Sequence, residues 1–559
     1  MQDPRGTGPC TDERGSGAAF RLASAWGLLL VGAAVVVVVT VAVGRRVLAE
    51  RSPFDVDEAE HANAAVELTS ALRSGEPEGI VKAVTRQSYY PPVHSFLVTT
   101  SYLLRGEELA SSRLPSLAMY VLAVLLLGAL TYRALRRLQP ETAAGWFPTF
   151  GTAIAIILAG SSPILIWYGA LCMVENTGVV ATILLFLACD ELFARPHKVG
   201  LQLLVALCGL VLFLTKYNLA LVVLPALVLT LRMMPWSLPE RHRLLLRVIG
   251  PLALGVVIWL ALIDRASFVS FFLGHPGDVP LLSSENLLFD IRAWLGVYGV
   301  HPVVGAGALL CAGYAAAIHY RKPIVRLTGF TALAAFGVLL ISTTNEARYL
   351  LVAAPALWFL AALGGAEFVH RGAQRLRQPF RSLLYGMVPL VLVALWAVPA
   401  HSAWQRLPAD LTREFEATPA DGELQDFIFT RVPATAPLLL NGETDKFSTM
   451  ALSFRGACEA HVPYTAMRID AYPFRADRLF HTRMSHRNVQ APFRIPGFPT
   501  HPLEAVLGMD YYRYAVQLRS ASFPEKAKAA DIEFASVLAR FESARATRGG
   551  HTVVIYTLP

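Results

Sequence analysis

The chain has 559 residues, of which 54% are hydrophobic and only 16% are charged, and its mean hydropathy is +0.47. These values exclude an ordinary soluble protein, since they exceed the apolar content that a globular domain carries. The net charge of +8 is spread over separate short connections between apolar segments, which argues against a nucleic-acid partner and for a lipid bilayer.

Residues 1–24 are rich in Gly and polar side chains, so we expect a disordered tail. The first apolar segment, 27–44, is longer than the apolar core of a usual signal peptide. Arg45 and Arg46 follow it without a small-residue cleavage site. We therefore predict that this segment is an uncleaved membrane anchor.

Ten further apolar segments follow the first one. A spanning helix needs roughly 20 residues to cross a hydrocarbon core of about 30 Å. We therefore predict an α-helical polytopic membrane protein with about eleven spanning helices. The ten segments are 115–132, 149–167, 175–193, 199–214, 217–231, 248–263, 294–318, 325–342, 349–364 and 382–400.

Lys and Arg are concentrated in every second short connection. The positive-inside rule places these connections and the N-terminus in the cytoplasm. An odd number of spans then leaves the loop 45–113 and residues 401–559 on the outer side. The basic connections contain Arg133, Arg136 and Arg137; Arg195 and Lys198; Arg232, Arg241, Arg243 and Arg247; Arg321, Lys322 and Arg326; and Arg371, Arg375, Arg377 and Arg381.

Two features bear on the source and compartment. Four of the cysteines, Cys172, Cys189, Cys208 and Cys311, lie in or beside apolar segments, which argues against an extracellular disulfide scaffold. No Asn begins an Asn-x-Ser/Thr sequence, which favours a bacterial source over the secretory pathway. We therefore expect a multi-pass protein of a bacterial inner membrane.

The external loop 45–113 begins with a segment that we predict to be a helix. Ser52 is suited to cap it, Pro53 suits its first turn, and the segment from Gly75 to Pro77 ends it. Its first turns carry an unusual number of acids, and His61 lies one turn after Asp57, where it can orient that carboxylate. These acids are Asp55, Asp57, Glu58 and Glu60.

The acids of this loop allow two interpretations. Acidic residues stabilise a helix N-terminus and are commonly solvated there, which needs no function. A carboxylate near the membrane surface can also act as a general base toward a hydroxyl acceptor. The residues alone leave both open.

A few charged residues lie at the external ends of apolar segments: Lys216, Arg348, Arg113 and Glu175. A charge at membrane depth costs at least about 2.5 kcal/mol on insertion scales, so such residues are candidate functional groups. The alternatives are a loop lysine at Lys216, a salt bridge from Arg348 to Glu346, an ordinary helix start at Arg113 and a helix cap at Glu175.

Six motifs occur in a characteristic order: Asp57-Glu58, Tyr90-Pro-Pro-Val-His94, Arg113-Leu-Pro-Ser116, Trp167-Tyr-Gly-Ala-Leu-Cys-Met-Val-Glu175, Leu214-Thr-Lys-Tyr217 and Ala347-Arg-Tyr-Leu-Leu-Val-Ala-Ala-Pro355. Together they resemble the GT-C membrane glycosyltransferases over about residues 25–400. The resemblance is greatest to the protein mannosyltransferases and the lipid A aminoarabinose transferases. Two positions depart from the family pattern: Tyr90 stands where His or Lys is common, and Glu175 where Asp is common.

The resemblance implies a GT-C transmembrane catalytic domain, 25–400, that uses a polyprenyl-phosphate-linked sugar and acts on the outer face of the membrane. It places the catalytic base at Asp57 and its acidic partner at Glu58. A polyprenyl phosphate is already a good leaving group, so the site needs a base and cations for the phosphate. Attack opposite the leaving group would invert the anomeric centre. The predicted phosphate-binding residues are Lys216, Arg348 and Arg113, and the predicted acceptor contacts or second acid are Glu175, His61 and His94.

The sequence leaves the metal, the sugar and the acceptor open. No His/Cys set has zinc spacing, while carboxylates permit a divalent cation without requiring one. The acceptor can be a glycan, a lipid or a protein. A polytopic transporter or flippase is the alternative function, but no half-to-half repeat is visible and the charges gather at external ends. A third possibility is a scaffold without catalytic activity that presents the C-terminal domain.

Residues 401–559 are predicted to form an external soluble α/β domain. Strand-like runs occur at Pro437–Asn441 and Thr552–Tyr556, and a helix-like stretch at Pro524–Ser543. A basic group here is predicted to be a solvated face, with binding of an anionic glycan or lipid as the alternative. It contains Arg475, Arg478, Arg483, Arg487 and Arg494.

Overall fold

The structure, a computed structural model, describes most of the first 377 residues and parts of the C-terminal region. With shorter pieces between them, the described residues are 13–49, 56–85, 90–138, 146–263, 284–298, 301–340, 347–377, 419–433, 438–441, 469–472, 513–520, 535–548 and 550–558. Most of the segment 382–400, expected to span the membrane, and the arginines between 475 and 494 lie outside this part of the chain.

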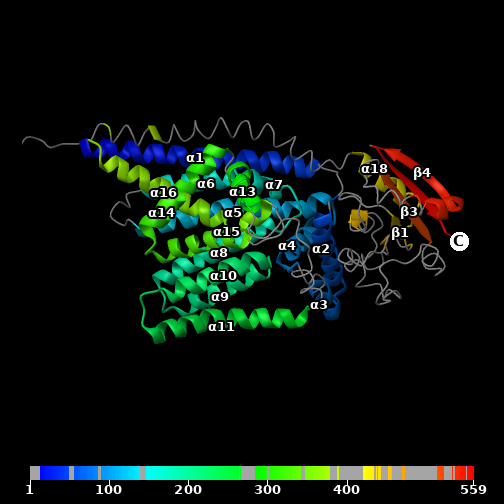
Figure 1. The fold of residues 1–559 in the computed structure, drawn as a ribbon, viewed down its shortest axis with the longest axis horizontal. Coiled ribbons are helices and arrows are strands. Elements are labelled where there is room, and N and C mark those ends of the chain that lie inside the picture. The colour runs from blue at the N-terminus through cyan, green and yellow to red at the C-terminus, as the bar shows by residue number, and fades with distance from the viewer. Residues whose placement is uncertain are drawn as a thin grey trace, which may run out of the picture.

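The described helices of the first 377 residues form one elongated bundle (Figure 1). Helix α5 lies at its centre, because it packs against α1, α6, α7 and α8. The helices that build the bundle are α1 (Glu13–Ala49), α5 (Leu109–Leu138), α6 (Trp146–Gly160), α7 (Pro163–Gly169), α8 (Glu175–Ala194), α9 (Val199–Phe213), α10 (Tyr217–Arg232), α11 (Leu238–Leu262), α14 (Pro302–His319), α15 (Pro323–Leu340) and α16 (Ala354–Gln374).

The described residues contain six helices that are long and apolar enough to cross a membrane: α1, α5, α8, α11, α14 and α15. The pair α6 and α7 makes a seventh if the two count as one span, and α9 and α10 are shorter apolar helices. A multi-pass membrane protein is thereby confirmed. The predicted count of eleven remains a prediction.

Two predicted spans differ in detail from the structure. The segment 149–167 is broken, since α6 and α7 meet at an angle of 60°. The break lies where Ser162 adopts an extended conformation before Pro163, which lacks the N–H that a continuous helix needs. The segment 294–318 consists of a π-helix, Trp294–Tyr298, followed by α14.

Helices α14 and α16 cross at very short range. A methyl group on Gly364 would stand 1.9 Å from the carbonyl oxygen of Cys311, so only glycine permits this crossing. Glu367 of α16 accepts a hydrogen bond from Arg371 at 2.6 Å and lies 3.8 Å from His319 of α14. These contacts fix α16, and with it the short helix that precedes it.

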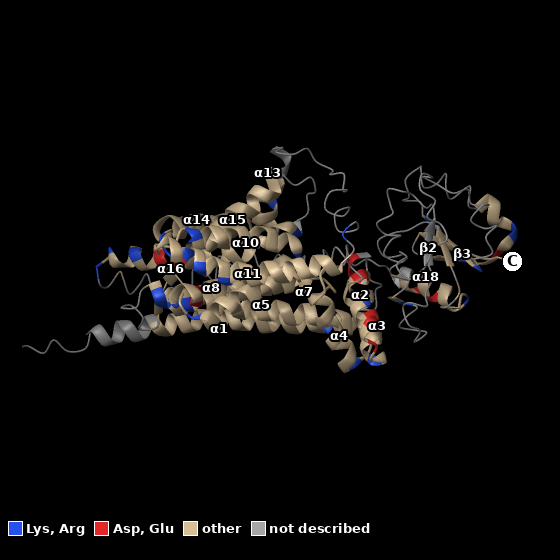
Figure 2. Cartoon of the chain, turned by 90° about the horizontal axis from the view of Figure 1, so that it is seen from below, with Lys and Arg blue, Asp and Glu red and all other residues tan. Residues whose placement is uncertain are grey.

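The two ends of the bundle differ in charge. The positions of Lys and Arg gather at the end away from α2 (Figure 2). There, Arg137 of α5 binds Asp190 and Glu191 of α8, with 2.7 Å between its Nη2 and Glu191 Oε1. The opposite end carries three short helices, α2 (Val56–Ser74), α3 (Pro77–Thr85) and α4 (Val93–Arg105).

The helix predicted in the first external loop is α2. It begins at Val56, after Phe54 in non-helical conformation, and ends at Gly75, which has a positive φ of 72°. The predicted start at Pro53 lies outside the described residues. Glycine suits position 75 because it adopts left-handed backbone angles without steric cost.

The C-terminal region contains a five-stranded sheet of order β2-β1-β3-β5-β4. The pairs of β1 with β2 and with β3 are parallel, and those of β5 with β3 and with β4 are antiparallel. Helix α18 (Pro419–Phe429) packs against β4. The strands are β1 (Leu438–Asn441), β2 (Ile469–Tyr472), β3 (Tyr514–Ser520), β4 (Glu542–Arg548) and β5 (His551–Thr557).

The sheet tests three sequence predictions. The strand-like runs ending at Asn441 and Tyr556 are confirmed as β1 and β5. The helix predicted to reach Ser543 is wrong at its end, because Glu542 and Ser543 belong to β4. Pairing with β5 prevails there over the helical pattern, since the ladder satisfies the backbone of both strands.

Candidate active site

Six of the charged residues singled out by sequence form three acid–cation pairs. They are Asp57 with Arg348, Glu175 with Lys216, and Glu58 with Arg113. The pairs bring together α2, α5, α8, the turn before α10 and the 3-10 helix Ala347–Val352. All three involve the end of the bundle that carries α2–α4, at which the acids of α2 are visible in Figure 2.

Asp57 lies in the first turn of α2 and keeps a third of its side-chain surface exposed (33%). Its Oδ2 accepts a hydrogen bond from Arg348 Nη1 at 2.6 Å. Tyr90 points its hydroxyl at Asp57 Oδ1 from 3.5 Å, the outer limit of a hydrogen bond. Asp57 is the most accessible of the three paired acids, which is what a base toward an incoming hydroxyl requires.

Glu175 is the first residue of α8 and its side chain is almost fully buried (1% exposed). Its Oε1 accepts a hydrogen bond from Lys216 Nζ at 2.6 Å. Among the described residues its Oε2 has no hydrogen-bond partner. Lys216 precedes α10 in extended conformation, and Leu214 beside it accepts a hydrogen bond from Val93, which ties this turn to α4.

Glu58 and Arg113 form a buried ion pair, with side-chain exposures of 0% and 1%. Arg113 donates from Nε and Nη2 to the two carboxylate oxygens at 3.0 and 3.2 Å. The backbone N–H of Cys172 donates to Glu58 Oε1 at 2.8 Å. This two-pronged contact joins α2 to α5 and to the turn before α8, so it fixes the helix that carries Asp57.

Two buried histidines lie beside these pairs. The His61 ring lies 4.5 Å from the Tyr90 ring and 5.4 Å from the His94 ring, centroid to centroid. His94 Nδ1 is 2.9 Å from the hydroxyl of Thr177 in α8. Neither ring nitrogen of His61, nor His94 Nε2, has a hydrogen-bond partner within the described chain.

Burial is the main influence on both histidines. It lowers the pKa of His61 to about 4, although the charges of Glu175 and Asp57 oppose this effect. It likewise lowers the pKa of His94 to about 3. Both rings are therefore neutral near pH 7, and each can donate or accept one hydrogen bond.

Tyr90 contacts Asp57, a role that the sequence did not predict, although Tyr90 begins the motif Tyr90-Pro-Pro-Val-His94. Burial, followed by the charge of Asp57, raises the pKa of its phenol well above 10. The hydroxyl therefore stays protonated and can donate to Asp57. Two prolines follow Tyr90 in the sequence, and this restricted backbone was the available signal.

The C-terminal region contacts the bundle beside the site, through Phe454 and Phe54. The ring of Phe454 lies 4.6 Å from that of Phe54, just before α2. The same Phe54 ring also contacts Arg113, whose guanidinium lies 4.9 Å from the ring centroid. The C-terminal region thus touches the residue that covers the Glu58–Arg113 pair.

Two further acids were noted at the start of this segment. Glu60 is buried within α2, and Asp55 lies outside the described residues. In the described part of the chain, no group of three or more His, Cys, Asp or Glu side chains is placed to hold a metal ion. The described site offers carboxylates, cations and neutral imidazoles.

The sequence matches no protein-family model, and no curated protein sequence matches it. Solved structures do match. ArnT from Cupriavidus metallidurans in the apo state aligns with a TM-score of 0.61 at 18% identity, over 95% of this chain and 98% of that chain. ArnT bound to undecaprenyl phosphate aligns with a TM-score of 0.62 at 16% identity and the same coverages. The chain therefore has the fold of ArnT, the GT-C fold that its sequence motifs resemble.

Proposed function

We propose that the protein is a membrane glycosyltransferase that moves a sugar from a polyprenyl-phosphate donor to a hydroxyl acceptor on the outer face of the membrane. The single observation that carries this proposal is the Asp57–Arg348 pair, a partly exposed carboxylate bound to a cation. Residues 25–400 would form the catalytic domain and 401–559 an external domain. The fold match with ArnT bound to undecaprenyl phosphate supports the class of donor.

Asp57 is the proposed base. In the transfer, the acceptor oxygen forms a bond to the anomeric carbon while the bond from that carbon to the donor phosphate breaks. The acceptor proton passes to Asp57, and the bonding electrons leave with the polyprenyl phosphate. Attack from the side opposite the phosphate inverts the anomeric centre. A positioned base of this kind typically contributes 10² to 10⁴-fold to the rate.

Arg348 and Lys216 are the proposed phosphate-binding residues. Each is held against an acid, yet each retains some exposure, and both carry charge that can stabilise the phosphate as it departs. A donor phosphate at Arg348 would share this guanidinium with Asp57 and so weaken the hold on that carboxylate. Binding of the donor would thus make Asp57 a better base.

Arg113 and Glu58 take a different role in this proposal. Their mutual burial and paired hydrogen bonds make them positioning residues for α2 rather than groups that touch the donor or the acceptor. Glu175, His61 and His94 are proposed to contact the acceptor, since Glu175 Oε2 and His61 have hydrogen-bonding capacity to spare among the described residues.

The test compares a strain that lacks the protein with strains that regain the wild type or Asp57→Asn. We expect polyprenyl-phosphate-linked sugar, measured by mass spectrometry of extracted lipids, to accumulate in the empty strain and with Asp57→Asn. Glu78→Gln, an exposed residue of α3, is the matched control and should clear the lipid as the wild type does. A lipid profile that stays the same in the absence of the protein would contradict the proposed function.

A further inference from the structure

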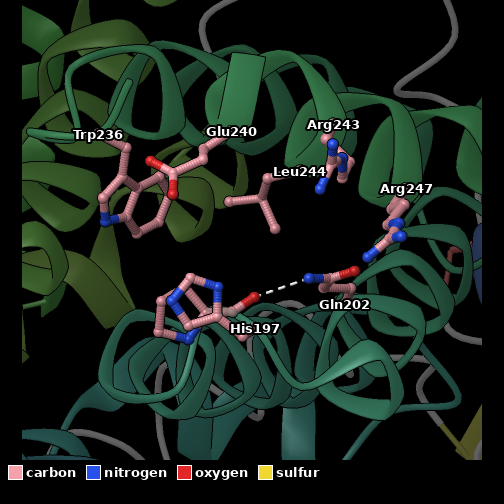
Figure 3. A pocket seen from close by; sticks show the side chains of 8 residues that line it. His197, Gln202, Trp236, Glu240, Arg243, Leu244 and Arg247 are labelled. Carbon is pink, nitrogen blue, oxygen red and sulfur yellow. Dashed lines mark hydrogen bonds between the residues drawn. The ribbon is translucent and has the colours of Figure 1, made fainter. Parts of the chain in front are cut away.

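A cavity of about 260 Å³ lies between α9 and α11, at the end of the bundle away from the candidate active site. Figure 3 shows that the side chains of α11 line one side and that Gln202 of α9 and His197 line the other. The lining combines basic, acidic, amide and apolar groups. It consists of Pro196, His197, Gln202, Trp236, Glu240, Arg243, Leu244 and Arg247.

The cavity has a basic side formed by Arg243 and Arg247. They are four residues apart on one helix, so both project from the same face of α11. Within the described part of the chain, neither guanidinium has a hydrogen bond or a salt bridge. The acid that lines the cavity, Glu240, uses Oε2 to accept hydrogen bonds from Ser237 N at 3.1 Å and Ser237 Oγ at 2.8 Å. The two arginines are therefore available to an anion.

Gln202 adds a buried acceptor beside the arginines. Its Nε2 donates to the carbonyl oxygen of Pro196 at 2.7 Å. Because a carbonyl can only accept, this contact fixes which end of the amide is which. The Oε1 is then directed away from Pro196, toward the side of Arg247 in Figure 3, and has no hydrogen-bond donor among the described residues. A ligand that carries a donor would satisfy it.

Apolar surface continues from the cavity along both helices. Leu203 and Leu207 of α9 and Leu246 and Leu254 of α11 are exposed. Helix α11 lies at the edge of the bundle in Figure 1, so this surface faces the hydrocarbon of the bilayer. A ligand with a charged head beside Arg243 and Arg247 can thus extend acyl chains along these leucines.

We propose that this cavity binds the headgroup of an anionic glycerophospholipid whose alcohol carries a hydroxyl group, such as a phosphoglycerol. The phosphodiester lies between Arg243 and Arg247, and the headgroup hydroxyl donates to Gln202 Oε1. Two guanidiniums favour a phosphate by their charge and because the N–H groups of each are arranged to bind two phosphate oxygens at once. The site is separate from the donor site, so it serves as a structural lipid site in the leaflet opposite the reaction.

The test is native mass spectrometry of the purified full-length protein with added dioleoylphosphatidylglycerol. We expect bound lipid to fall roughly fivefold for each arginine removed, and by tenfold or more in Arg243→Gln/Arg247→Gln, because a basic residue near an anionic surface contributes about 1 kcal/mol. Arg136→Gln, an exposed arginine at the same end of the bundle, should bind as the wild type does. Equal lipid binding by the double variant and the wild type would overturn the site.

Two further ligands identify the headgroup. Dioleoylphosphatidylmethanol has the same charge as phosphatidylglycerol but no headgroup hydroxyl, so we expect the wild type to bind it several-fold less and Gln202→Leu to bind both alike. Equal binding of the two lipids by the wild type would overturn the role of Gln202. Inorganic phosphate at the same concentration should not displace the lipid; if it does, the cavity is a site for a free anion and the lipid assignment fails.

Discussion

Arg348 Nη1 lies 2.6 Å from Asp57 Oδ2, which joins the proposed base to a proposed phosphate-binding cation across 291 positions of sequence. The two roles are therefore linked. A guanidinium that gives part of its hydrogen bonding to a donor phosphate holds the neighbouring carboxylate less firmly. In the proposed reaction, the arrival of the donor would thereby make Asp57 a better base.

Removing either member of this pair should reveal the link. Asp57→Asn and Arg348→Ala are each expected to lower turnover by about 10²-fold or more, since one loses the base and the other a charge that stabilises the leaving phosphate. The double variant should lose much less than the product of the two factors. Turnover of the protein in membranes, with its own donor and acceptor, is the measurement. Fully multiplicative losses would show that the two residues act independently.

Variants of the Lys216–Glu175 pair can distinguish an effect on donor binding from an effect on stability. Lys216→Met leaves a buried carboxylate without its partner, so we expect both a lower melting temperature and weaker use of the donor. Adding Glu175→Gln should restore most of the melting temperature, because the uncompensated charge is gone, but not the use of the donor. Recovery of both properties in the double variant would leave Lys216 with a structural role only.

The Glu58–Arg113 pair should act mainly on stability. Glu58→Gln or Arg113→Gln is expected to cost about 3–5 kcal/mol of unfolding free energy, because each leaves one buried charge without its partner. Glu107→Gln breaks a more exposed pair with Arg73 and should cost about 0–1 kcal/mol. Thermal unfolding in detergent measures the difference. If Arg113→Gln melts like the wild type but binds the donor poorly, Arg113 belongs to the phosphate site after all.

Acid should destabilise the site through its histidines. The pKa of His61 is lowered from 6.5 to about 4 by burial, so between these values the unfolded chain binds a proton that the folded chain does not. The contribution of neutral His61 to the free energy of unfolding is therefore fully present above about pH 6.5 and is lost as the pH falls toward 4. His61→Phe should flatten this dependence, and His94→Phe should act in the same direction. The measurement is the melting temperature between pH 4.5 and 7.5. If it depends on pH as steeply in both variants as in the wild type, the buried, neutral state is contradicted.

Topology can be tested with fusions of reporter enzymes. The positive-inside rule and an odd number of spans predict which connections face the cytoplasm. A cytoplasmic signal after Ala420 would contradict the odd number. Cytoplasmic signals are expected after Arg137, Lys198, Arg243, Lys322 and Arg377, and external signals after Glu175, Asn345 and Ala420.

The sequence by itself determined the features that depend on neighbouring residues. Hydropathy showed a multi-pass membrane protein, and the order of short motifs indicated the GT-C fold. The stop of α2 at Gly75 and the strands β1 and β5 were also predicted, because turn residues and alternating apolar runs act locally. The same local signals also drew attention to Asp57, Glu58, Glu175, Lys216 and Arg348.

Only the tertiary structure decided which of these residues are partners. The sequence offered Glu346 beside Arg348; packing places Asp57 against this arginine, while Glu346 lies outside the described residues. It offered Arg113 as a phosphate ligand, and packing of α2 on α5 shows this arginine buried against Glu58. It extended a helix to Ser543, but pairing with β5 makes that end a strand. Each outcome depends on groups far apart in the chain, whose contact free energy exists only once the helices and strands are assembled.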